Sequence, residues 1–370
     1  MEEKLNEAAV TAEAERQEVE NTTKAMKCPS CGANMVFSAE RGALYCEYCG
    51  CVREVESENS EEIDFSRLLS SDNGWAEESH VFCCQNCGAR EVLAKNEFAK
   101  TCSFCGTPNI VETDELPGLR PNAVVPFAVS KEQASANARK WMRKRLFAPR
   151  KFRKGAKPEE IRGMYMPAFT FDAATDSTYT ATLGVYRYRT TRRNGRTVQV
   201  RYTHYFNVSG RYSSAFDDVL VQASSDKGKD AVRKIQPFDT RRSRAYTQEY
   251  LSGFTAEQSA VPGMQCWEEA KDIMRARLQA QILSGYRYDV VSSFNISTRY
   301  SGVTYKYILL PVYVGHSNWR KKLYNFFVNG ASGKVAGKAP VSPFKVACVV
   351  VLGAAVVALL AWLWITFTGG

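Results

Sequence analysis

The feature that most constrains this chain is a cysteine pattern that occurs twice with the same spacing. The pattern is C-x2-C-x14-C-x2-C, and its second copy begins 56 positions after the first. Two CxxC pairs separated by a short hairpin can bring four thiolates onto one tetrahedral Zn(II). The predicted ligands are Cys28, Cys31, Cys46 and Cys49 in the first copy and Cys84, Cys87, Cys102 and Cys105 in the second.

A four-thiolate site has no open coordination position, so the two predicted Zn(II) ions should stabilise the fold and not catalyse. A disulfide framework is the alternative. The charged N-terminal segment lacks the apolar stretch of a signal peptide, and CxxC pairs in the cytosol more often bind metal. A thioredoxin-type redox motif would need a βαβ context that the sequence does not show.

Three further side chains flank the two cysteine units and are candidate substitute ligands. They are Cys51, Cys83 and His80. Their positions fit the ligand spacing less well, so an unligated thiol or imidazole is the favoured interpretation.

The second decisive feature is an apolar segment near the other end of the chain. Residues 346–367 carry no charge over 22 positions, which as a helix is about 33 Å and matches a hydrocarbon core of about 30 Å. We expect a single-pass C-terminal tail anchor. Basic residues precede the segment and none follows it, so the positive-inside rule places the N-terminal bulk in the cytoplasm.

The net charge of +10 is concentrated in one stretch. Residues 131–157 contain eleven basic residues and one acidic residue, Glu132. We predict a basic helix over 131–147, with Ser130 and Gln133 forming a capping box. Nucleic-acid contact, attachment to anionic lipid and plain packing against the β domain all remain open for this helix.

The chain between and around these features predicts an α+β fold. Tyr-, Thr- and Val-rich segments read as antiparallel strands at 177–190, 197–214, 216–224, 289–300, 304–315 and 323–337. Hairpin signals occur at Asn194–Gly195 and Asn329–Gly330. A helix is expected over about 267–283, with Ala270, Ile273, Met274, Ala276 and Leu278 as its apolar positions.

These elements divide the chain into six predicted parts. A mainly antiparallel β domain with a few helices lies between two N-terminal zinc ribbons and a single transmembrane helix. The parts are an acidic disordered or helical arm (1–26), zinc ribbon 1 (27–56), a linker (57–80), zinc ribbon 2 (81–112), the β-rich domain (113–343) and the tail anchor (344–370).

Recognisable catalytic patterns are missing from the sequence. His80, His204 and His316 are the three histidines, and they form no HExxH pattern. The glycines at 333–338 lack the spacing of a phosphate loop and fit a hairpin turn better. Asp217–Asp218 and Glu268–Glu269 are expected to be solvated charges, or helix-start charges for the second pair. We predict that the protein is not an enzyme.

Three stretches carry a resemblance to a known family: MYMPAFTFD (164–172), YKYILLPVYVG (305–315) and YNFFVNGASGKVAGKAP (324–340). They resemble a bacterial family of tail-anchored zinc-ribbon membrane proteins, whose members are often labelled primosomal-protein-N′-like or transcription-factor-IIB-type zinc-ribbon proteins. The resemblance covers most of the chain from Cys28 to the anchor. It implies a location in the bacterial cell membrane and an association with SPFH-type and phage-shock-type membrane proteins.

Together these features predict a non-enzymatic scaffold or adaptor that faces the cytosol and binds partner proteins at the inner membrane. By resemblance, the partners expected are SPFH-type or phage-shock-type proteins. The alternative is a membrane-tethered nucleic-acid-binding protein. The identity of the partner and the oligomeric state do not follow from the sequence.

Overall fold

The computed structural model describes residues 27–69, 79–94, 102–104, 110–113, 119–153, 161–193, 196–224, 226–319 and 322–368. The predicted acidic arm, the Asn194–Gly195 turn and Cys105 lie outside this part of the chain. Within it the fold is α+β with mainly antiparallel strand pairs, as the sequence predicts.

Three unusually long strands form the centre of the molecule. They are β9 (Arg162–Arg193), β10 (Arg196–Gln222) and β13 (Val290–Trp319). β9 lies between the other two and is antiparallel to both. The sequence predicts separate shorter strands here, and that is wrong, because bulges at Phe216/Val219 and Ser301/Thr304 let each strand continue past its local break.

Shorter strands extend this sheet on several sides. β12 pairs parallel with β9 and β8 pairs parallel with β13, while the remaining pairs are antiparallel. The shorter strands of the large sheet are β4 (Ile63–Asp64), β5 (Ser79–Cys84), β6 (Arg90–Ala94), β7 (Ile110–Thr113), β8 (Ala123–Val124), β11 (Arg244–Ala245), β12 (Thr255–Glu257), β14 (Lys322–Asn329) and β15 (Val335–Gly337). β1 (Val36–Ser38), β2 (Ala43–Tyr45) and β3 (Val52–Glu54) form a separate small sheet.

The β14–β15 hairpin confirms the turn signal at Asn329–Gly330. Residues 326–328 pair with 335–337, and the intervening turn contains Gly333 with a φ of +75°. This is a left-handed conformation that glycine adopts without steric cost. The glycines of 333–338 therefore belong to a hairpin, as predicted.

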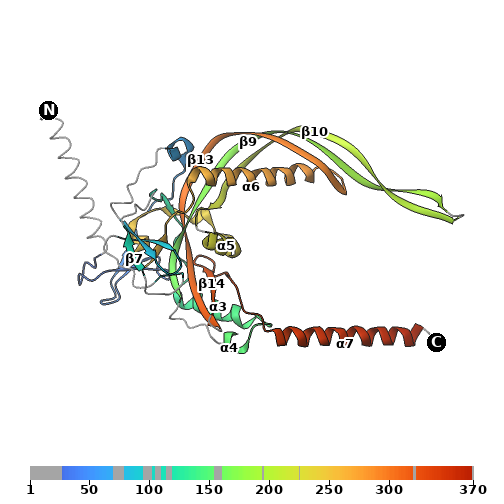
Figure 1. Ribbon diagram of the computed structural model, residues 1–370. Helices are drawn as coiled ribbons and strands as arrows, with labels where there is room; N and C mark the ends of the chain where they lie inside the picture. Colours follow the sequence, from blue (N-terminus) through green and yellow to red (C-terminus); the bar gives the residue numbers. More distant parts are fainter. Residues whose placement is uncertain are drawn as a thin grey trace.

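Helix α6 (Gly263–Ser284) covers one face of the long strands, under the arch seen in Figure 1. Its buried side chains include Trp267, Ala270, Met274 and Leu278, which pack in one cluster with Phe169 and Phe171 of β9. The predicted helix is confirmed and starts one turn earlier, after Pro262. The prediction is wrong for Ala276, which is exposed.

Helix α3 (Lys131–Arg143) begins as predicted, with Ser130 and Gln133 forming a capping box. It ends earlier than predicted. The chain turns at residues 144–149, and a short helix α4 (Arg150–Arg153) follows Pro149. The other helices are η1 (Phe65–Leu69), α5 (Asp226–Ile235), η3 (Thr240–Arg242), η4 (Gln248–Leu251) and α7 (Pro343–Thr368).

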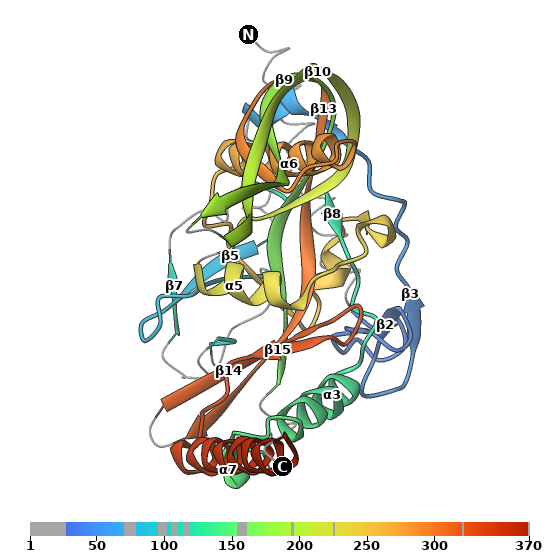
Figure 2. The ribbon, with the colours of Figure 1, turned by 90° about the vertical axis from the view of Figure 1, so that its right-hand side faces the viewer.

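Helix α7 and a two-stranded ribbon project from the body in the same direction (Figures 1 and 2). The ribbon arises because β13 pairs with β9 only up to Gly184, whereas β9 and β10 stay paired as far as Arg193 and Arg196. Beyond Gly184 the ribbon therefore has no third strand among the described residues.

Candidate metal centres and the apolar helix

The first cysteine unit gathers four thiols at one point. The Sγ atoms of Cys28, Cys31, Cys46 and Cys49 all lie within 4.8 Å of one another. Cys28 Sγ is 3.3 Å from Cys49 Sγ, and Cys31 Sγ is 3.5 Å from Cys46 Sγ. A tetrahedral zinc with Zn–S bonds of about 2.3 Å has sulfur–sulfur separations of about 3.8 Å. These two separations are within about half an ångström of that value, so the four residues could hold a metal ion.

The three CxxC pairs that the structure describes in full share one backbone turn. In the first pair the N–H of Cys28 donates to the carbonyl of Ala33, and the N–H of Gly32 donates to the carbonyl of Cys28. Cys46 and Gly50 repeat this geometry, as do Cys84 and Gly88. Gly32, Gly50 and Gly88 have φ values of +72°, +75° and +72°. The left-handed residue that closes the turn explains why glycine follows the second cysteine in these three pairs.

In the first unit, the turns also stabilise thiolate at the first cysteine of both pairs. Burial opposes a charge on Cys28, but backbone N–H groups of Cys31 and Ser30 outweigh it and lower the pKa of Cys28 to about 6. Backbone N–H groups of Cys49 and Tyr48 likewise lower the pKa of Cys46, against the effect of burial. Against backbone N–H groups of Ala33 and Cys51, the neighbouring thiols raise the pKa of Cys31 and Cys49. Because thiolate is the metal-binding form, the lowered pKa values favour metal binding at Cys28 and Cys46.

The second cysteine unit brings together the three of its predicted ligands that the structure describes. Cys84, Cys87 and Cys102 lie within 4.8 Å of one another, with Cys87 Sγ 3.6 Å from Cys102 Sγ. The predicted fourth ligand, Cys105, lies outside the described residues. Both units could therefore hold a metal ion.

The spare side chains near the two units stand apart from these groupings. Among the described residues, neither cysteine cluster includes Cys51, Cys83 or His80. The Cys51 thiol points at the carbonyl of Val52 at 3.9 Å, and the His80 ring packs edge-on against Phe82 at 4.8 Å.

The first unit is fixed to the body by its strand β1. The N–H of Phe37 donates to the carbonyl of Ser252, and the Ser252 hydroxyl donates to the carbonyl of Met35 at 2.5 Å. Cys28 and Cys46 belong to the same buried cluster as Tyr250, which follows from this docking. The first cysteine unit is therefore packed into the core through Cys28 and Cys46.

The second unit is fixed by a buried carboxylate that the sequence analysis missed. Glu91 of β6 is 1% exposed and accepts hydrogen bonds from the N–H of Ser103 at 2.7 Å and its hydroxyl at 2.9 Å. Ser103 lies between Cys102 and Cys105 in the chain, so Glu91 holds the loop that carries Cys102. Burial raises the pKa of Glu91, and the Ser103 bonds oppose that rise. An acidic residue in the apolar stretch REVLA is the only local signal for this role.

We expect Glu91→Ala to weaken metal retention in the second unit. The substitution leaves the buried N–H of Ser103 without its acceptor, which costs about 1–3 kcal/mol. Competition with a chelator, followed by metal analysis, should show faster loss of one metal equivalent. Glu47→Ala is the matched control, because Glu47 occupies the position of Ser103 in the first unit but is exposed. Equal metal loss in both variants would contradict the assignment.

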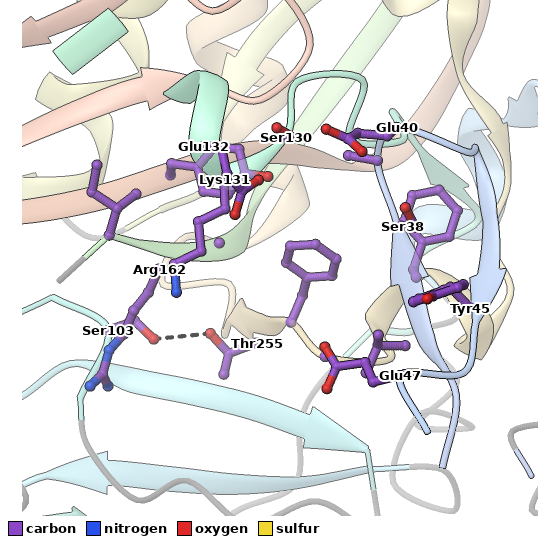
Figure 3. A pocket seen from close by; sticks show the side chains of 18 of the residues that line it. Ser38, Glu40, Tyr45, Glu47, Ser103, Ser130, Lys131, Glu132, Arg162 and Thr255 are labelled. Carbon is purple, nitrogen blue, oxygen red and sulfur yellow. Dashed lines mark hydrogen bonds between the residues drawn. The ribbon is translucent and has the colours of Figure 1, made fainter. Parts of the chain in front are cut away.

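A cleft of about 790 Å³ lies where the first unit, α3 and the second unit meet (Figure 3). Tyr45 and Glu47 of the first unit face it, Lys131 and Glu132 of α3 lie across from them, and Thr255 is at its floor. The hydroxyls of Ser103 and Thr255 lie 3.2 Å apart there. Both cysteine units and the large sheet thus share one concave surface.

A third cluster contains carboxylates around a lysine. Glu62, Asp172 and Asp218 have oxygens within 4.8 Å of one another. Lys306 Nζ lies 2.6 Å from Glu62 and 2.9 Å from Asp218, and its side chain is 9% exposed. The prediction that Asp218 is a solvated charge is wrong. Asp218 has a φ of +50° in the β10 bulge, which turns its carboxylate inward.

We expect Asp172→Asn to stabilise the protein more at pH 8 than at pH 5.5. Burial, together with Glu62 and Asp218, raises the pKa of Asp172 from 3.8 to about 6, although the N–H of Asp218 opposes this. The folded state therefore holds the proton more tightly, so this carboxyl reduces stability as the pH rises through about 4 to 6. Urea unfolding of both proteins at the two pH values measures the effect. An equal gain at both pH values would contradict it.

Helix α7 is long and apolar enough to cross a membrane. Its window from Pro343 to Leu360 carries a single charge, Lys345, and no part of it is buried against the body. Its first turn is nevertheless tied to the α3–α4 turn. The N–H of Ser342 donates to the carbonyl of Phe147, and Lys345 Nζ donates to the carbonyls of Leu146 and Ala148.

Comparison with known proteins gives one informative relative. No protein-family model and no solved structure matches the chain. The chain is 32% identical over 332 residues to the uncharacterized protein YdjG of Bacillus subtilis (strain 168). The similarity covers 87% of this chain and 91% of YdjG, and so includes the greater part of both proteins. The chain therefore belongs to the same protein family as YdjG.

Proposed function

We propose that the protein is a membrane-anchored scaffold with two structural zinc ribbons, and that it binds partner proteins at the cytoplasmic face of a bacterial membrane. In this proposal α7 is the anchor and Zn(II) occupies both cysteine units. The protein has no catalytic role. By resemblance, its partners are SPFH-type or phage-shock-type membrane proteins.

The observation that carries the proposal is the continuous set of contacts that links the cysteine units to the body from which the anchor leaves. The first unit docks through Ser252, the second joins the large sheet through the β6–β12 pairing, and the same sheet leads through β15 into α7. A four-thiolate site supplies stability and not an open coordination position. Such a body would hold the shared cleft at a fixed orientation to the membrane, as a scaffold requires.

Two further features support zinc as the metal and the cytoplasm as the location of the body. Four sulfur ligands in a tetrahedral arrangement are typical of zinc, or of iron–sulfur centres, and the short CxxC turns match structural zinc sites. Lys322, Lys334, Lys338 and Lys345 all precede the apolar part of α7. The positive-inside rule then places the body in the cytoplasm.

Cross-linking in intact cells, followed by purification of the full chain in detergent, tests the proposal. We expect an SPFH-type or phage-shock-type protein to be enriched, and the yield to fall when the cleft residues Glu40 and Glu47 are changed to lysine. Cys51→Ser, which lies outside the cysteine cluster, should retain the partner. Recovery of the same proteins with wild type and with the cleft variant would contradict the scaffold function.

A second candidate function rests on the two-stranded ribbon. Residues 177–216 contain no acidic residue, and Arg187, Arg189, Arg192 and Arg201 are exposed. Arg201 lies 4.3 Å from the centre of the Tyr186 ring. Exposed arginines among tyrosines suit phosphate contact and base stacking, which favours a nucleic-acid-binding protein tethered to the membrane. Binding of an oligonucleotide at physiological salt that is lost when these arginines become glutamine would favour this function.

A further inference from the structure

The base of α7 is joined to the most basic segment of the chain. Three hydrogen bonds connect Ser342 and Lys345 to the carbonyls of Leu146, Phe147 and Ala148, at 2.7–2.9 Å. The α3–α4 turn therefore has a fixed place beside the point where α7 leaves the body (Figure 2). Any bilayer that α7 crosses must begin close to this turn.

Exposed apolar side chains cluster at this junction. Leu146 is 70% exposed and Phe147 43% exposed, and on the α7 side Val341 is 64% and Phe344 75% exposed. Large apolar side chains in water are unfavourable, and a contiguous group of them marks a surface that contacts another phase or molecule.

Basic side chains surround these apolar residues. Lys140, Arg143, Lys144 and Arg145 are exposed, and no acidic residue occurs from Gln133 to Arg153. Within the described part of the chain, none of these four side chains forms an ion pair. Lys140, Arg143 and Lys144, with Arg139 and Ala136, line a shallow groove of about 470 Å³. The Arg145 guanidinium lies over the Trp141 ring at 4.3 Å.

The opposite face of α3 is already occupied. Ala134, Ala138 and Met142 are fully buried in the core, and Trp141 packs against it. Packing therefore explains the apolar side of the helix and leaves its basic side unexplained. Since the basic side continues into the exposed apolar turn beside α7, a ligand with both anionic and apolar parts fits this surface better than a nucleic acid.

We propose that this surface, residues 139–153 together with 341–345, binds anionic phospholipids of the bilayer that α7 crosses. The basic side chains contact the phosphate headgroups, and Leu146, Phe147 and Phe344 enter the boundary between headgroups and acyl chains. Trp141, under Arg145, lies beside that boundary. The inference rests on the proposed function only in requiring that α7 spans the membrane.

Hydrogen–deuterium exchange of the full chain in nanodiscs tests the inference. Exchange of residues 140–153 is expected to be several-fold slower in discs that contain phosphatidylglycerol than in discs of phosphatidylcholine alone. Each basic residue near an anionic surface contributes up to about fivefold in binding, so four of them readily give a difference of this size. Inorganic phosphate added to the phosphatidylcholine discs should not reproduce the protection, because free phosphate is not held at the bilayer surface and gives that surface no lasting negative charge.

Two matched variants identify the residues responsible. Changing Lys140, Arg143, Lys144 and Arg145 to glutamine should abolish the difference between the two lipids. The control variant removes the same amount of charge from the ribbon, by changing Arg187, Arg189, Arg192 and Arg201 to glutamine. It should preserve the difference in exchange between the two lipids. Equal exchange in both lipids, or equal loss in both variants, overturns the proposal. So does stronger protection by an oligonucleotide than by phosphatidylglycerol.

The test also separates this inference from the proposed function. Protein that leaves the discs in an alkaline wash would show that α7 does not span the bilayer, and the proposed anchor would fail. Protein that resists the wash but shows no lipid dependence at residues 140–153 would leave the anchor intact and overturn only the lipid-binding surface.

Discussion

Cys28→Ser is expected to remove one of two metal equivalents and to lower the free energy of unfolding by about 4 kcal/mol or more, since loss of a structural metal is among the few changes that reach this size. Apparent zinc binding energies in isolated finger peptides are about 10–16 kcal/mol, and the docked unit retains part of its contacts without metal. Metal analysis of the purified chain and urea denaturation measure the two effects.

The destabilisation should not stay within the first unit. Cys28 and Cys46 share a buried cluster with Tyr250 and Leu251, and Ser252 bonds to the adjacent backbone. The spacing alone predicts two locally closed units that unfold separately, whereas the packing predicts that loosening the first also exposes η4. Protection of residues 248–252 from hydrogen exchange should therefore fall in Cys28→Ser.

Cys51→Ser provides the control for this experiment. Its thiol is next to the first unit but lies outside the four-thiol cluster, with the carbonyl of Val52 at 3.9 Å. It should keep both metals and nearly the full stability. A Cys28→Ser protein that still binds two equivalents, or a wild-type protein that binds none, would be incompatible with the assigned ligands.

The parts of the structure that the sequence predicts well depend on neighbours close in the chain. Cysteine spacing with a following glycine specifies the CxxC turns, Ser130 with Gln133 specifies the start of α3, and an uncharged run specifies α7. In each case the stabilising partners lie within a few residues, or within one hairpin, of one another.

The parts that it predicts poorly depend on distant partners. Gly302, with a φ of +58°, and the Asp217–Asp218 pair resemble strand ends, yet both lie in bulges of strands that continue. Lys306 makes burial of Asp218 possible, and nothing near Asp218 in the chain indicates that lysine. The burial of Glu91 is hard to predict for the same reason, because its partner Ser103 belongs to a separate loop.

The membrane anchor can be tested by introducing charge at the middle of α7. Leu352→Lys with Val356→Lys is expected to move most of the protein from the alkali-resistant membrane fraction to an extractable one. A lysine at the centre of a spanning helix costs about 2.5–3.5 kcal/mol on insertion scales, so two such residues cost about 5–7 kcal/mol. That corresponds to a shift of roughly four orders of magnitude in partition.

The body of the protein should survive this change, which makes the result interpretable. Leu352 and Val356 are 66% and 54% exposed, and α7 touches the body through its first turn. The released double variant is therefore expected to keep both metals. Leu352→Ile with Val356→Ile, which conserves apolar character, should remain alkali-resistant. High salt weakens contacts between exposed charges and does not weaken a spanning helix, so wild-type protein that high salt alone extracts would show that α7 lies on the membrane instead of crossing it.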